Sequence, residues 1–284
     1  MSEKIAIIVC SNSGIDYISH PNKIDVFRSL LYVNGEEFED YLDISADDFY
    51  ERLVKEPQTI VNTSQTATGK MLEVYNRLES EGFTDAIVIT ISSYLSGTYQ
   101  NAVLAGNMLE SLKVHIFNSR TAAFPEAKMA LVASDMAKEG KSVNEILAAL
   151  EHIRENNKIY FPVDTLKYLV KNGRLSATRG FMGSLLKLKP LLTITKEGRI
   201  VPIKKIRTFS KALNHVKEKF FEEVKGFSFE PFIIHTNNID LANKIAKEIT
   251  ERFPEIKEVP MYPLTPVVGA HVGPGAFGIG YIKK

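Results

Sequence analysis

The sequence predicts an α/β protein in which a mainly parallel sheet is covered by helices. Short apolar runs rich in β-branched residues alternate with segments whose apolar residues recur every three or four positions. This strand–helix rhythm is typical of parallel sheets with helices on both faces. The clearest run, residues 87–91, leads into a hydroxyl-rich segment, residues 92–98, and then into a helical pattern. We therefore interpret residues 87–91 as a buried central strand.

Capping residues mark the helices in the first 156 residues. Ser45 with Asp48, and Ser142 with Glu145, have the spacing of capping boxes, and Gly82 ends a further helix. The expected elements, in order, are strand 5–9, strand 27–33, helix 46–55, helix 71–81, strand 87–91, helix 99–109, strand 114–117, helix 126–138 and helix 143–156.

Two hydroxyl-rich turns are expected at residues 62–69 and 92–98. We expect both to follow strands of the parallel sheet, where ligands bind beyond the carboxyl ends. A helix that starts there exposes N–H groups suited to a carboxylate or a phosphate. The turn at residues 10–14, after the first strand, is expected to face a ligand as well.

The pattern changes near residue 157, where we place a domain boundary, to within about ten residues, between domains 1–157 and 158–284. The second domain is expected to be a smaller α/β domain. Its expected elements are strand 160–163, a helix ending near Gly173, an amphipathic segment at 181–188, a hairpin of strands 191–195 and 200–206, helix 211–224, strand 232–235, helix 241–253, strand 259–262, a glycine-rich loop containing His271, and strand 279–282.

Composition excludes several classes of function. The chain of 284 residues is 44% hydrophobic and 24% charged, as expected of a soluble globular protein. A net charge of +1 gives no overall attraction for nucleic acid. No apolar run reaches the ~18 residues that a membrane span needs. Cys10 is the only cysteine, so no intrachain disulfide can form, which fits the cytoplasmic location that we expect.

Common catalytic and metal motifs do not fit. Residues 273–278 spell G-x-G-x-x-G, but neither a helix nor an acidic residue follows at the required distance. The histidines and the cysteine lack metal-site spacing, so no metal or cofactor is expected. A nucleophile elbow at Ser96 would need glycine in place of Tyr94. Ser93 or Ser96 with His271 nevertheless stays open as the nucleophile–base pair of an acyl hydrolase or transferase.

Five strings remain, and their order and spacing carry a resemblance over nearly the whole chain. They are residues 63–65, 92–102, 118–120, 166–169 together with 173–176, and 271–280. Together they resemble the DegV family, bacterial fatty-acid-binding proteins that include the FakB subunits of fatty acid kinase. The resemblance implies a DegV-like two-domain α/β fold with an acyl chain buried between or beneath the domains.

The resemblance also implies how the carboxylate is held. Hydroxyls and a histidine would hydrogen-bond it, and by motif position these are Thr63, Ser93 and His271. Three further hydroxyls, those of Ser64, Ser96 and Thr98, are expected to contact the head group as well. For Ser96 and Thr98, capping of the following helix is the alternative role, and it is the one that we expect.

A protein partner is implied as well. FakB members present the bound fatty acid to a separate kinase that uses ATP to make acyl-phosphate, so the chain itself would be non-catalytic. Arg174 and Arg207 match positions linked to that partner or to the phosphoryl group. Transient membrane contact fits such a carrier, and a monomer is our preference. A lipid sensor for another partner stays open, because a binding pocket does not identify its client.

Three positions depart from the family pattern. Cys10 and Asn118 stand where the family usually has Asp, and Thr66 stands where it usually has Pro. These changes remove charge near the head-group end and leave the hydroxyls. The tail depends less on them, because burying a long acyl chain gives roughly 11 kcal/mol before ordering costs, at about 0.8 kcal/mol per CH₂.

Overall fold

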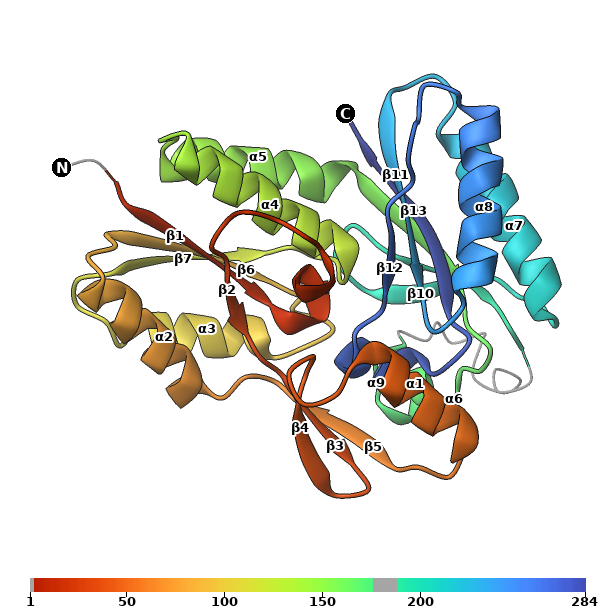
Figure 1. Ribbon diagram of the computed structural model, residues 1–284, viewed down its shortest axis with the longest axis horizontal. Coiled ribbons are helices and arrows are strands. Elements are labelled where there is room, and N and C mark those ends of the chain that lie inside the picture. The colour runs from red at the N-terminus through yellow and green to blue at the C-terminus, as the bar shows by residue number, and fades with distance from the viewer. Residues whose placement is uncertain (1–2, 176–187) are drawn as a thin grey trace.

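A four-stranded parallel sheet forms the first part of the chain, as the sequence predicts (Figure 1). The computed structural model describes residues 3–175 and 188–284. The sheet has the order β2-β1-β6-β7, with β1 (Ile5–Cys10), β2 (Asp25–Phe27), β6 (Asp85–Thr90) and β7 (Lys113–Asn118). Its helices are α2 (Thr68–Ser80) and α3 (Thr98–Gly106) on one face, and α4 (Phe124–Lys138) and α5 (Val143–Asn156) on the other. Two short 3-10 turns, η1 (Ser11–Ser13) and η2 (Ile15–Tyr17), follow β1.

Alternating residues of β1 show why this sheet is covered on both faces. Ala6 and Ile8 belong to the core that packs with α2 and α3, whereas Ile7 and Val9 belong to the core that includes residues of α4. Side chains alternate between the faces of a strand, so a continuous apolar run requires cover on both sides. Only the strand ends are then free to carry polar side chains toward a ligand.

A six-stranded mixed sheet forms the second part, and it has more strands than the first. Its order is β10-β9-β8-β13-β11-β12, with β8 (Asn157–Pro162), β9 (Leu191–Ile194), β10 (Ile200–Lys204), β11 (Phe229–His235), β12 (Met261–Pro263) and β13 (Phe277–Lys283). Helices α7 (Phe209–Glu223) and α8 (Ile239–Arg252) pack against it (Figure 1). Gly280 of β13 is required here, because a Cβ atom would lie 2.1 Å from the Phe232 ring and 2.6 Å from the Lys158 carbonyl oxygen.

A small antiparallel sheet lies below the two larger ones in Figure 1 and brings distant segments together. It has the order β4-β3-β5, with β3 (Leu30–Val33), β4 (Glu36–Glu39) and β5 (Val61–Ser64). Helix α9 (Pro266–Val272) contacts β3 and β5, and it also packs against α1 (Ala46–Lys55) and α6 (Lys167–Lys171). Three stretches far apart in the sequence therefore meet around α9.

The small sheet accounts for two predictions that were wrong. Residues 27–33 are not one strand: β2 and β3 belong to different sheets, because the Ser29 N–H donates to Ser11 Oγ (3.3 Å) and leaves the ladder. Residues 62–69 are not a turn after a parallel strand. Thr63 lies within β5, opposite Leu31 of antiparallel β3, and α2 begins only at Thr68.

Two further expectations need correction. His271 lies in the last turn of α9 and not in a loop, because Pro266 starts a seven-residue helix that ends before Gly273. The helix expected at 99–109 ends at Gly106, and Leu104 and Met108 are exposed. The amphipathic segment expected at 181–188 lies outside the described residues, apart from its last position.

The helix caps are largely confirmed. Ser142 and Glu145 make both bonds of a capping box at α5. At α1, the Ser45 hydroxyl oxygen accepts from the Asp48 N–H (3.1 Å), as expected of a capping box. The Asp48 carboxylate accepts from the Ser45 hydroxyl and not from the Ser45 backbone N–H, so only half of the expected box forms.

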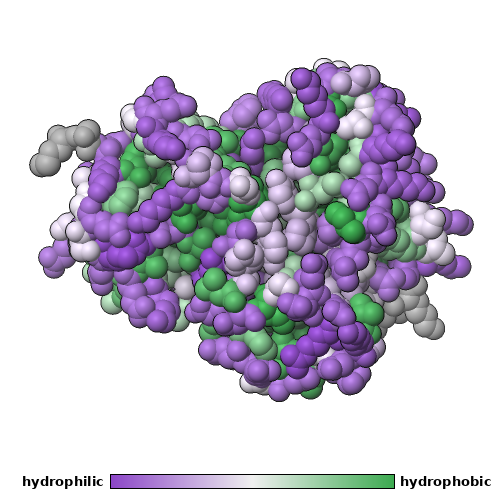
Figure 2. Space-filling view, in the orientation of Figure 1, coloured by the Kyte–Doolittle hydropathy of each residue, from purple (hydrophilic) through white to green (hydrophobic). Residues whose placement is uncertain are grey.

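The surface is mostly polar on the face shown in Figure 2, with hydrophobic residues in separate groups. None of the helices within the described residues combines the length and hydropathy needed to cross a membrane.

Candidate ligand-binding site

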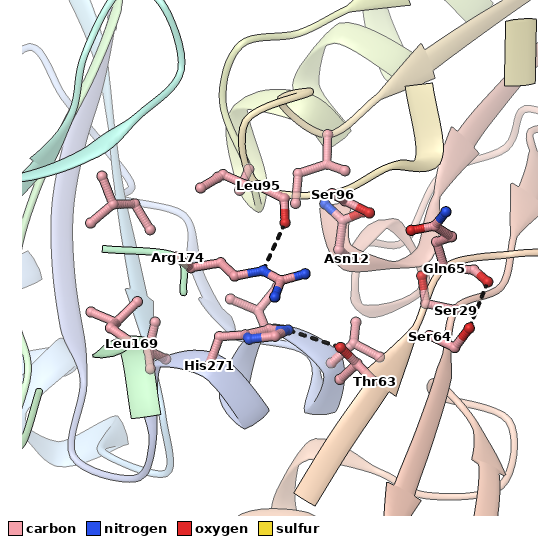
Figure 3. Close-up of a pocket in the computed structure, with 16 residues that line it drawn as sticks. Asn12, Ser29, Thr63, Ser64, Gln65, Leu95, Ser96, Leu169, Arg174 and His271 are labelled. Atoms are coloured by element: carbon pink, nitrogen blue, oxygen red, sulfur yellow. Dashed lines mark hydrogen bonds between the residues drawn. The ribbon is translucent and has the colours of Figure 1, made fainter. Parts of the chain in front are cut away.

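A cavity of about 360 Å³ lies where segments associated with all three sheets meet helix α9 (Figure 3). The hydroxyl and amide groups that line it come from four segments of the chain. These residues are Asn12 and Ser29, Thr63, Ser64 and Gln65, and Ser96. Arg174 and His271 line the opposite side in Figure 3. The cavity therefore collects polar side chains from both halves of the sequence.

His271 and Thr63 form the central pair of this cavity. His271 Nε2 lies 2.9 Å from Thr63 Oγ1, so α9 and β5 are joined by a hydrogen bond between residues 208 positions apart. The other ring nitrogen, Nδ1, is buried and has no hydrogen-bond partner among the described residues. His271 Nδ1 can therefore form a further hydrogen bond, and it belongs to a residue that lines the cavity.

The His271 ring is neutral at pH 7. Burial of the ring, together with the nearby Arg174 charge, lowers the His271 pKa to about 4. A neutral imidazole carries one N–H, so the proton shared with Thr63 can come from either residue. In either case one hydrogen remains without a partner, on Nδ1 or on the Thr63 hydroxyl. An acceptor such as a carboxylate oxygen satisfies it.

Helix α9, which carries His271, is held by residues from the first part of the chain. Asp40 Oδ1 accepts from the Val267 N–H (3.3 Å), and the Tyr50 hydroxyl donates to the Leu264 carbonyl (3.0 Å). Gly269 allows Tyr50 this close, because a Cβ atom would lie 2.3 Å from Tyr50 Oη. Burial raises the Asp40 pKa to about 6. The position of His271 therefore depends on residues more than 200 positions earlier.

Arg174 supplies the positive charge in the cavity. Its Nε donates to the Leu95 carbonyl (3.1 Å), and its guanidinium also donates to the Asn172 carbonyl. No carboxylate pairs with it among the described residues, so its charge is held by neutral acceptors. An anion bound beside His271 would therefore find an uncompensated cation.

An apolar cavity adjoins this one. A second cavity of about 50 Å³ is lined almost wholly by apolar side chains. Four residues line both cavities: Ala122, Ile200, Val268 and Val272. The combined space is polar at the His271 end and apolar at the other, which matches the shape of an amphipathic ligand.

The remaining predicted site residues take different places. Ser64 lines the cavity. Ser96 does too, and its hydroxyl is 2.8 Å from that of Thr98 and accepts from the Thr98 N–H. The N-cap residue of α3 is Gly97 and no side-chain cap bond forms there, so the capping role expected of Ser96 and Thr98 is wrong. Ser93 does not line the cavity, and its hydroxyl accepts from Asn118 Nδ2 (2.8 Å). Its carboxylate-binding role stays a prediction.

Thr98 and Arg207 lie outside the cavity lining. Thr98 is buried at the start of α3. Arg207 is exposed and directly precedes Thr208, the N-cap residue of α7.

Asn12 confirms that the turn after β1 faces the cavity, and it reveals a residue that the sequence analysis missed. Asn12 Nδ2 donates to Glu126 Oε2 (2.7 Å) in the first turn of α4. Glu126 is fully buried, and this burial raises its pKa well above the usual value. An acidic residue in the first helical turn is ordinarily interpreted as a favourable partner of the helix dipole, so the sequence held no signal for this contact.

The geometry gives the serine–histidine alternative little support. The hydrogen bond of His271 goes to Thr63, while Ser93 and Ser96 are bonded to Asn118 and Thr98. A catalytic histidine is normally oriented by a third group, and Nδ1 of His271 has no partner among the described residues. Within the same residues, no cluster of three His, Cys, Asp or Glu side chains could hold a metal ion.

Comparison with known proteins gives consistent matches over the full length. The family model described as "Uncharacterised protein, DegV family COG1307" matches residues 4–284. A DegV domain-containing protein of Halalkalibacterium halodurans is 39% identical, covering 99% of each chain. A DegV domain-containing protein of Staphylococcus aureus is 35% identical, covering 99% of this chain and 98% of its own.

Solved structures agree with these matches. DegV, a fatty acid binding protein from Bacillus subtilis, superimposes with a TM-score of 0.88 at 30% identity and covers all of both chains. A fatty-acid-binding DegV family protein from Thermus thermophilus gives the same TM-score at 25% identity, covering 99% of this chain and 100% of its own.

Proposed function

The chain belongs to the DegV family, and on that premise we propose that it binds a long-chain fatty acid. The carboxylate lies at Thr63 and His271, and the tail extends through the residues shared by the two cavities. The observation that carries this proposal is the Thr63–His271 pair, with its unpartnered ring nitrogen, at the polar end of a space that becomes apolar. The fatty-acid-binding relatives of the same fold support it.

The tail and the carboxylate of the ligand would contribute differently to binding. The tail supplies most of the free energy, because each buried CH₂ contributes about 0.8 kcal/mol. The contacts to the carboxylate therefore serve mainly to orient it, and neutral hydrogen-bond donors such as Thr63 and His271 are sufficient for this. Arg174 compensates the negative charge without contacting a carboxylate of the protein. An exposed carboxylate also stays accessible to a second reactant.

We expect the purified protein to carry fatty acid, and the Thr63→Val variant to retain much less of it. Removing the hydroxyl takes away the partner of His271 Nε2 and with it the arrangement that holds a donor toward the carboxylate, which costs roughly 1–3 kcal/mol, or about 5- to 150-fold in affinity. Mass spectrometry of an organic extract measures the bound lipid per protein.

Thr250→Val is the matched control for this change. Thr250 lies on α8 and its hydroxyl donates to the Lys247 carbonyl, outside both cavities. This variant should retain as much lipid as the parent. An empty parent protein that also fails to bind added fatty acids would contradict the carrier proposal.

We further propose that the bound fatty acid is presented to a kinase subunit in the cytoplasm. One carboxylate oxygen would attack the γ-phosphorus of ATP on that partner, and ADP would leave. Arg174 in the cavity and Arg207 on the surface are the cations proposed to serve this encounter. Ser93 is proposed as a further carboxylate donor. A monomer that touches membranes transiently fits such a carrier.

Replacing Arg207 with Ala should slow phosphorylation of the bound fatty acid without reducing lipid retention. The residue is exposed and outside the cavity, so it can affect only the encounter, where loss of one charge is expected to lower the rate on the order of tenfold. Phosphoryl transfer from ATP by the catalytic subunit of a bacterial fatty acid kinase gives the rate. Arg252→Ala, at the exposed end of α8, is the control. Lost lipid retention in a folded Arg207→Ala variant would argue against a partner role.

A further inference from the structure

A second pocket, separate from the proposed fatty-acid site, has a strongly positive lining. Its volume is about 280 Å³, and it lies between the segment after β7, the end of α5, and strands β8, β9 and β13. Five of its side chains are cationic and one is acidic. The cations are Arg120, Arg154, Lys158, Lys196 and Lys283, and the acid is Glu155. No residue of this set lines the fatty-acid cavity.

Glu155, the only acidic residue of this lining, already interacts with three of the cations. Glu155 lies 3.6 Å from Arg120 Nη1, 3.6 Å from Lys196 Nζ and 3.7 Å from Arg154 Nε. Arg154 has one further acidic partner, Glu151, on the outer surface of α5. One carboxylate cannot neutralise three cations, so positive charge is left over in a confined space.

Two of the cations, Arg154 and Lys158, are partly buried. The side chain of Arg154 is only 13% exposed, and its Nε has no hydrogen-bond partner among the described residues. Burial lowers the Lys158 pKa, Glu223 raises it, and the neighbouring Lys219 and Lys196 charges lower it further. A partly buried cation and an unsatisfied donor at a pocket are groups that an anion would bind strongly.

The local backbone holds Arg120 at the rim of this pocket. Its φ angle is +52°, a left-handed conformation that a non-glycine residue rarely adopts. Asn118 stabilises this turn, because its Oδ1 accepts from the Arg120 N–H (3.1 Å). The string 118–120 is one of those that the sequence analysis singled out, and the fatty-acid cavity does not use Arg120.

We propose that this pocket binds the phosphate groups of a small soluble molecule. The five cations come from four separate segments and can donate to non-bridging oxygens, as arginine and lysine do in phosphate sites. Phe227 and Tyr281, whose ring centroids are 5.6 Å apart, give the pocket an apolar side for the rest of the ligand. Among the described residues, the ion pairs of these five cations go only to Glu155 and Glu151.

Inorganic pyrophosphate, titrated by calorimetry at low ionic strength, tests this proposal. The parent protein should show saturable binding at one site. The double variant K196Q/K283Q should bind at least roughly tenfold more weakly, because it loses two exposed lysines of the pocket. The double variant K70Q/K247Q removes the same charge from exposed lysines on α2 and α8 and should bind like the parent. Equal weakening in both variants, or no saturable binding by the parent, would overturn the proposal.

Acetylation of lysines, followed by mass spectrometry, provides a test that needs no variant. Pyrophosphate should protect Lys158 and Lys196 and leave Lys247 as reactive as before. Equal reactivity of all three with and without pyrophosphate would contradict the site.

Lipid head groups carry the same phosphate chemistry, and vesicles containing phosphatidic acid separate the two sources. Pyrophosphate binding without flotation of the protein on these vesicles supports a soluble ligand. Flotation that K196Q/K283Q abolishes and K70Q/K247Q preserves would overturn the soluble source and assign the pocket to a membrane.

Discussion

Replacing Ala122 with Phe is expected to weaken binding of a 16-carbon fatty acid on the order of 100-fold. Ala122 lines both cavities, so a phenyl ring there would occupy the passage between the polar and the apolar end. If about four methylene groups lose their buried place, the loss is about 3 kcal/mol at 0.8 kcal/mol each, which corresponds to this change in affinity. Titration with fatty acids of graded chain length measures it.

Chain length makes this experiment diagnostic. An eight-carbon acid, which needs little of the apolar extension, should bind the Ala122→Phe variant nearly as well as the parent, and Ala122→Val should give an intermediate result. Ala148→Phe, on the exposed face of α5, is the control for introducing the same side chain. Unchanged affinity for the 16-carbon acid, in a variant that unfolds at the parent's temperature, would place the tail elsewhere.

The second large effect is expected in the acid dependence of stability. Between pH 6.5 and pH 4, the free energy of unfolding of the parent should fall by about 3 kcal/mol relative to the His271→Gln variant. The folded-state His271 pKa is about 4, below the usual 6.5, so in this window the unfolded chain binds a proton that the native state does not. Well above pH 6.5 the ring is neutral in both states and its contribution is constant. Urea unfolding at pH 4 and pH 6.5 measures the difference.

Asp40 has the opposite effect on how the free energy of unfolding of each protein depends on pH. Its pKa is raised to about 6 from the usual 3.8, so the native state gains stability from it as the pH falls through that range, and loses it as the pH rises. Both proteins contain Asp40, so its effect cancels when the parent is compared with the variant. Parallel pH curves for the two proteins would contradict the buried, neutral His271 described above.

The sequence predicts the architecture well because the signals for it are local. Alternating apolar runs and helical periodicity predict the parallel sheet and its helices, and Ser142 with Glu145 marks the start of α5. The family resemblance indicates Thr63 and His271 as a site, and the structure places these two residues 2.9 Å apart. Their role toward a carboxylate is a proposal that the distance supports.

The errors arise where structure depends on distant partners. The hydroxyls around Thr63 resemble a turn, and only the pairing of β5 with β3 makes them a strand. Helix α9 has seven residues, too few for a periodic pattern, and the glycines that follow it indicate a loop instead. Glu126 shows the same limit, because its partner Asn12 lies 114 positions away.

Because Thr63 of β5 and His271 of α9 are hydrogen-bonded to each other, a ligand bound to both would also stabilise the packing of these two parts of the chain. A molecule held by residues 63 and 271 stabilises only the arrangement in which both parts of the chain are together. At a free concentration 100 times its dissociation constant, it would add about 2.7 kcal/mol to that arrangement. The empty protein would open more often and be cut sooner by cellular proteases. The abundance of the carrier would then follow the supply of what it carries, without any change in its gene expression.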